Sequence, residues 1–178
     1  MERADRAGSS TLLILAKLLL FTVCVPGSVT VWLPLYAIYP WLRRQPLIWD
    51  GRTYGALVVI LLGVAGYLWC ALDFAFVGRG TPAPIDPPKV LVARGLYRFS
   101  RNPMYVSVLL ILAGESILFW SRQLVIYAAA VAVVFHLFVL LYEEPTLRRK
   151  MGTAYEQYCS VTPRWLLKVS RRRRTYAI

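Results

Sequence analysis

The chain has 178 residues and a formal net charge of +12; 58% of its residues are hydrophobic and 17% are charged. Soluble globular chains have roughly 25% charged residues, so this composition leaves too little polar surface for a water-soluble particle and indicates an integral membrane protein. Basic residues beside apolar segments favour anionic lipid headgroups as partners and argue against nucleic acid.

The first apolar segment is 11–42, and it carries a single charge, Lys17. A spanning helix needs about 20 residues and a hairpin of two spans about 40, so we expect one long helix that bends near Pro26 or Pro34. A pair of short re-entrant helices is the alternative. The residues after Pro26 form a poor cleavage site, which favours a retained span over a signal peptide.

Three further segments are predicted to span the membrane: 54–77, 103–120 and 124–143. The segment 78–102 is rich in proline and is expected to form an extended polar loop, because proline lacks an amide donor and restricts the residue before it. Pro103 suits the first turn of the third span, and Asn102 is expected to cap that helix.

The remainder, 146–178, is predicted to be a basic tail at the membrane interface. Leu147, Met151, Tyr155 and Tyr158 recur at helical spacing, so we expect one amphipathic helix. The arginines 171–174 are expected to bind anionic lipid. The sequence thus predicts a single-domain, all-α, polytopic membrane protein with four spans, or five if the first segment forms two, and a C-terminal amphipathic helix.

The distribution of basic residues predicts the orientation. With four spans, the N-terminal residues, the loop 78–102 and the tail share one side and hold sixteen basic residues, against four in the two short loops opposite. The positive-inside rule places the larger set in the cytoplasm. Spans joined by only three residues must be antiparallel neighbours, so Arg101 and Asn102 should lie near Glu143 and Glu144.

Several polar residues in this region are candidates for chemistry. Glu143 and Glu144 can hold hydroxyl groups or an ammonium, while the nearby helix N-terminus suits a carboxylate; an ion pair with an arginine is the structural alternative. His136 lies almost on the helix face of Glu143, and either lines the same pocket or bonds a neighbouring helix. Glu115 is costly at its depth in the third span, unless it lies near the opposite interface.

No metal site is expected. Cys24, Cys70 and Cys159 are too few and too widely spaced for a zinc site or a disulfide framework. We interpret them as packing residues. His136 is the only histidine in the chain.

Residues 65–165 contain an ordered set of short motifs. They are Gly80-Thr-Pro-Ala-Pro84, Leu91-Val-Ala-Arg-Gly-Leu-Tyr97, Arg101-Asn-Pro-Met-Tyr105, Gly114, Leu140-Leu-Tyr-Glu-Glu-Pro145, Gly152-x-x-Tyr155-x-x-Tyr158 and Pro163-Arg-Trp165. Together they resemble the membrane methyltransferases of the isoprenylcysteine carboxyl methyltransferase and phospholipid methyltransferase superfamily.

The resemblance implies S-adenosylmethionine as the methyl donor, bound in a cytoplasmic pocket, and a lipid substrate that enters from the bilayer. With His136 added for its helix face, the predicted cofactor-binding residues are Gly78, Gly80, Gly95, Tyr97, Arg101, Asn102, Pro103, Tyr105, His136, Glu143 and Glu144.

The methyl acceptor is predicted to be a phospholipid amine, because Asn102-Pro-Met-Tyr105 and Tyr142-Glu-Glu-Pro145 resemble the phospholipid branch. An amine must lose a proton, which makes Glu143, Glu144 and Glu115 the candidate catalytic residues.

Three alternatives to this acceptor or activity stay open. The first is carboxyl methylation of an isoprenylcysteine-like or other small hydrophobic acceptor, because the ending Pro163-Arg-Trp165 resembles the isoprenylcysteine branch. In either case, Arg164 and Trp165 are predicted to contact the substrate. A lipid-binding protein without activity and a reductase are the others. No oligomeric state is predicted.

Overall fold

The computed structural model describes residues 16–37, 48–78 and 91–165, and every regular element in these ranges is a helix. Three helices are long and apolar enough to cross a membrane: Ala16–Tyr36, Gly51–Val77 and Arg122–Met151. The apolar helix Pro103–Leu118 is shorter. The all-α fold is confirmed for the described residues, while the number of membrane crossings stays a prediction.

The helix Ala16–Tyr36 contains a π-helical turn, η1 (Ser28–Trp32), and ends as α2 (Leu33–Ala37). η1 stops two residues before Pro34, where the missing amide and the ring of proline disturb the helical hydrogen bonds. The backbone departs from a regular helix in the region where a bend was expected. A hydrogen bond from the Tyr127 hydroxyl to the carbonyl oxygen of Val29, 2.8 Å long, ties this turn to the rest of the bundle.

α4 (Gly51–Asp73) continues as η2 (Phe74–Gly78). The side chain of Asp50 accepts a hydrogen bond of 2.9 Å from the amide of Thr53, so Asp50 is the N-cap. The helix therefore begins three residues earlier than Tyr54, the start predicted from hydropathy, because the cap lies in the polar segment that precedes the apolar one.

α5 (Pro103–Leu118) packs along α4, and glycines allow a close approach. A Cβ atom added at Gly63 would lie 2.8 Å from the carbonyl oxygen of Ser107, and one at Gly114 would lie 3.0 Å from that of Ala56. Small residues are typical of such contacts in membranes, where packing rather than water exclusion drives helix association.

α6 (Arg122–Phe138) passes through a π turn, η4 (Val139–Glu143), directly into α7 (Glu144–Met151). The helix of the predicted fourth span continues past residue 143, because the π turn accommodates Pro145; where this helix leaves the membrane stays a prediction. The single amphipathic helix predicted after it is wrong. Gly152, with φ of 53°, separates α7 from α8 (Thr153–Val161).

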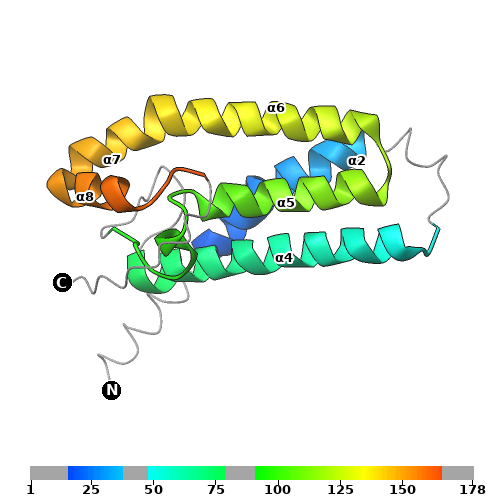
Figure 1. Ribbon diagram of the computed structural model, residues 1–178, viewed down its shortest axis with the longest axis horizontal. Coiled ribbons are helices and arrows are strands. Elements are labelled where there is room, and N and C mark those ends of the chain that lie inside the picture. Colours follow the sequence, from blue (N-terminus) through cyan, green and yellow to red (C-terminus); the bar gives the residue numbers. More distant parts are fainter. Residues whose placement is uncertain (1–15, 38–47, 79–90, 166–178) are drawn as a thin grey trace, which may run out of the picture.

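In Figure 1, α5 and α6 run antiparallel and join at the end of the bundle away from α7 and α8. The 3₁₀ turn η3 (Gly95–Arg98) precedes α5. The start of α5 therefore lies at the same end of the bundle as α7 and α8, as the short connection predicts.

Substituting Gly63 by leucine should lower the stability of the protein in detergent. The new side chain would push against the backbone of α5, and overpacking typically costs about 1–3 kcal/mol, so the midpoint of thermal unfolding should fall by several degrees.

Gly55→Leu is the matched control on the same helix, because a Cβ atom there meets nothing within 4 Å. Equal unfolding midpoints for the two variants would contradict the close α4–α5 contact.

Candidate active site

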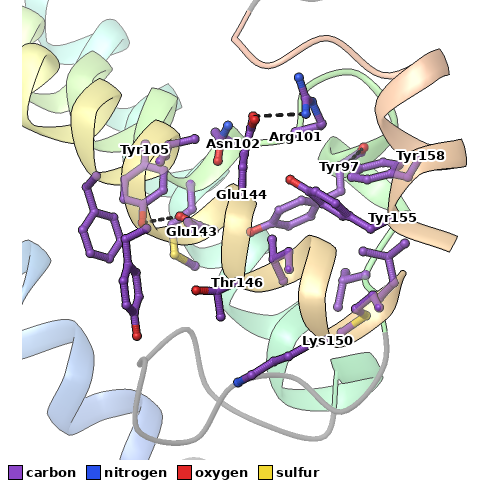
Figure 2. A pocket seen from close by; sticks show the side chains of 18 of the residues that line it. Tyr97, Arg101, Asn102, Tyr105, Glu143, Glu144, Thr146, Lys150, Tyr155 and Tyr158 are labelled. Carbon is purple, nitrogen blue, oxygen red and sulfur yellow. Dashed lines mark hydrogen bonds and ion pairs between the residues drawn. The ribbon is translucent and has the colours of Figure 1, made fainter. Parts of the chain in front are cut away.

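A cavity of about 140 Å³ lies where the η3–α5 corner faces η4, α7 and α8 (Figure 2). A water molecule needs about 10–15 Å³ of such space, so the cavity is large enough for several waters or for part of a ligand. Its polar lining residues are Tyr97, Arg101, Asn102, Tyr105, Tyr142, Glu143, Glu144, Thr146, Lys150, Tyr155 and Tyr158.

Glu144 is buried and neutralised by two arginines. Its Oε1 atom lies 3.1 Å from Nη1 of Arg101 and 2.6 Å from Nε of Arg164, while its Oε2 atom accepts a second bond of 2.9 Å from Arg164. Such two-point contacts are among the strongest charged hydrogen bonds. They raise the pKa of Arg164 above its ordinary value. Glu144 therefore acts as an anchor that joins α7, the η3–α5 corner and the C-terminal residues.

Glu143 has a different environment, although it is adjacent in sequence. Its Oε2 atom accepts a hydrogen bond of 2.9 Å from the hydroxyl of Tyr105 (Figure 2). Within the described residues it forms no ion pair. Glu143 thus brings to the cavity a carboxyl group that no described cation neutralises.

Residues 162–165, the C-terminal strap, close the corner above the cavity. The amide of Arg101 donates to the carbonyl oxygen of Pro163 (2.9 Å), and the side-chain amide of Asn102 donates to that of Arg164 (3.1 Å). Asn102 occupies the N-cap position of α5, but its side chain forms no capping bond. The expected capping role is therefore wrong, because the strap takes the side chain of Asn102.

The tyrosines of α8 complete the wall. The Tyr158 hydroxyl donates a hydrogen bond of 2.6 Å to the carbonyl oxygen of Tyr97. Burial raises the pKa of Tyr97, Tyr155 and Tyr158, so these hydroxyls remain protonated donors at neutral pH.

The cavity is also lined by the four residues that recur at helical spacing in the sequence: Leu147, Met151, Tyr155 and Tyr158. Sequence reasoning attributed the same spacing to a lipid-facing helix. It also missed Thr146 and Lys150, although both lie on the helix turns that directly follow Glu143.

Several predicted site residues lie outside the cavity. His136 is exposed, and its Nδ1 atom accepts a hydrogen bond of 3.1 Å from Nε1 of Trp165. Both residues line a separate apolar groove between α5 and α6. Arg164 is bound to Glu144, and neither Arg164 nor Trp165 lines the cavity. The substrate contacts expected for them stay predictions.

The remaining predicted residues are also not in the cavity wall. Gly95 has φ of 56°, and a Cβ atom there would lie 2.5 Å from Oδ2 of Asp73, so it serves a tight turn. Pro103 is buried at the start of α5. One carboxyl oxygen of Glu115, further along α5, is buried without a hydrogen-bond partner in the described part of the chain.

Gly78 ends η2, whereas Gly80 lies outside the described residues. The rest of the predicted loop over 79–90 and the arginines 171–174 lie outside them as well.

The fold and the cavity together define a helical membrane protein with an aromatic and acidic pocket at one end of its bundle. Residues 52–154, more than half of the chain, match the phospholipid methyltransferase family. The chain belongs to this family, within the superfamily that also includes the isoprenylcysteine carboxyl methyltransferases. No curated protein and no solved structure shows a significant match.

Replacing Arg164 by alanine should destabilise the strap. The change removes two charged hydrogen bonds from a buried carboxylate, at a cost of about 1–3 kcal/mol, since Arg101 still compensates part of the charge. Thermal unfolding should begin at lower temperature, and limited proteolysis should cut the C-terminal segment faster.

Arg148→Ala is the control. Arg148 forms an exposed ion pair with Glu156, with 3.7 Å between the charged atoms, and such surface pairs contribute little to stability. A strap equally resistant to protease in both variants would contradict the anchoring role of Glu144.

Proposed function

We propose that the protein transfers a methyl group from S-adenosylmethionine to the amine of a membrane phospholipid at the cytoplasmic face. Membership of the phospholipid methyltransferase family supports methyl transfer to a lipid-like substrate. The cavity supports a cofactor site made by Tyr97, Arg101, Asn102, Tyr105 and Glu143.

The observation that carries this proposal is the unneutralised carboxyl group of Glu143 among aromatic rings. Tyr105, Phe138 and Tyr142 line the cavity beside it. A carboxylate attracts a cation, and aromatic faces attract weakly hydrated cations that lack strong hydrogen-bond donors. Sulfonium and methylated ammonium groups are cations of this kind, and both take part in phospholipid amine methylation.

The same geometry favours an amine over a carboxylate as acceptor. A carboxylate acceptor needs a cation to orient it, but Arg101 and Arg164 are both bound to Glu144. The remaining cation of the cavity wall, Lys150, lies two helical turns after Glu143 in the chain. Glu143 is instead suited to hold an ammonium, or to take its proton.

S-adenosylmethionine, when bound, supplies a methyl group carried on a positively charged sulfur. The chain's residues then have three tasks. Tyr105 orients the carboxyl group of Glu143, and the aromatic wall excludes water. Glu143 takes a proton from the lipid ammonium, so that the lone pair of the neutral amine can form the new carbon–nitrogen bond while the methyl–sulfur bond of the donor breaks and a neutral thioether leaves. Alignment of donor and acceptor supplies much of the rate in such a displacement.

The three acids then differ in role. Glu143 is the candidate base, and Glu144 positions the strap and Arg101. Glu115 does not line the cavity and is a weaker candidate for proton transfer. We further propose one domain over residues 1–178, four or five membrane crossings and a cytoplasmic site, from the family and the excess of basic residues.

Glu143→Gln should weaken S-adenosylmethionine binding at least tenfold, measured by titration calorimetry on purified protein in detergent. The substitution keeps the shape of the side chain and removes its charge. Glu156→Gln on the exposed side of α8 should leave the affinity unchanged.

Unchanged affinity in a folded Glu143→Gln protein would contradict the site. The reaction itself is tested by transfer of labelled methyl groups into extracted membrane lipids, with identification of the product by mass. Labelled lipid with a methylated amine is expected. A labelled methyl ester would show carboxyl methylation. A wild-type protein that binds lipid but transfers no label would contradict the proposed methyltransferase activity.

A further inference from the structure

We infer that Lys150 and Thr146 form a subsite for the phosphate group of the acceptor lipid, at the end of the cavity opposite Glu143. The inference rests on the proposed function. It adds two residues, Lys150 and Thr146, that would distinguish a phospholipid amine from other amines and from carboxyl acceptors.

One helix face places the three polar groups in the cavity. Glu143, Thr146 and Lys150 all line it. Residues seven positions apart lie on nearly the same side of a helix and about 10 Å apart along its axis. In Figure 2 the polar ends of Glu143, Thr146 and Lys150 follow one another along the η4–α7 ribbon.

Lys150 is exposed like its basic neighbours Arg148 and Arg149, but it alone of the three lines the cavity. Arg148 pairs with Glu156 on the outside of α7, and neither Arg148 nor Arg149 lines the cavity. Lys150 lines the cavity and forms no ion pair in the described part of the chain. The two acids nearest to it in sequence both have other partners: Glu144 is bound by two arginines and Glu156 pairs with Arg148.

The cavity wall therefore offers a carboxyl group at one end, a hydroxyl in the middle and an ammonium at the other, and neither charged group has an ion-pair partner among the described residues. Its ligand should carry the opposite order of charges: a cation near Glu143 and an anion near Lys150. A phospholipid amine headgroup has this order, with an ammonium and a phosphate separated by two carbon atoms. The Lys150 ammonium would contact the phosphate as a point charge, and the Thr146 hydroxyl would donate a hydrogen bond to it.

S-adenosylmethionine contains the other anion to consider, a carboxylate. If this group used Lys150, the lysine would set cofactor affinity and leave lipid affinity unaffected. The two sources are therefore separated by measuring both ligands on the same variants.

The test is titration calorimetry in detergent with three ligands: short-chain phosphatidylethanolamine, an alkylamine without phosphate, and S-adenosylmethionine. Lys150→Gln should weaken binding of the phospholipid about tenfold, which corresponds to a loss of about 1.4 kcal/mol. Its affinities for the alkylamine and for S-adenosylmethionine should not change. Lys150→Arg should restore most of the phospholipid affinity, and Arg149→Gln should match the wild type for all three ligands.

Two results would overturn the inference. One is wild-type affinity for phosphatidylethanolamine in Lys150→Gln, and the other is a selective loss of S-adenosylmethionine affinity in that variant. The proposed function fails separately, when wild-type protein neither binds S-adenosylmethionine nor transfers a methyl group to lipid.

Discussion

The buried ion cluster around Glu144 is the interaction on which the cavity end of the molecule depends. A carboxylate removed from water needs charged partners and hydrogen bonds to compensate its lost hydration. Arg101 supplies one partner from the corner before α5, and Arg164 supplies the other from the C-terminal strap. Three segments that are distant in sequence are thereby held around one side chain.

This cluster also explains how two adjacent acids acquire different chemistry. Neighbouring residues on a helix point about 100° apart, so Glu144 reaches the arginines while Glu143 reaches the hydroxyl of Tyr105. Because Glu144 binds both arginines, Glu143 has no ion-pair partner among the described residues. The two adjacent acids thus have separate partners: two arginines for Glu144 and the hydroxyl of Tyr105 for Glu143.

The sequence alone predicted much of this arrangement and misjudged some of its details. The short connection between α5 and α6 predicted that Arg101 and Asn102 face the acids. Hydropathy could not show that the helix continues past Pro145, because a π turn accommodates that proline. Regular helix geometry predicted that His136 lies on the same side of its helix as Glu143. Its ring instead lies in a groove beside Trp165 and not in the cavity.

What the sequence determined by itself is the class of protein and the region of its chemistry. Long apolar segments require a helical membrane fold, since backbone groups in lipid must bond within their own segment, and ordered motifs indicated a membrane methyltransferase. Only the tertiary structure decided which acid is neutralised and which apolar face lines the cavity. These depend on where the strap and α8 return to the corner before α5, and such long-range contacts leave no periodic pattern in the chain.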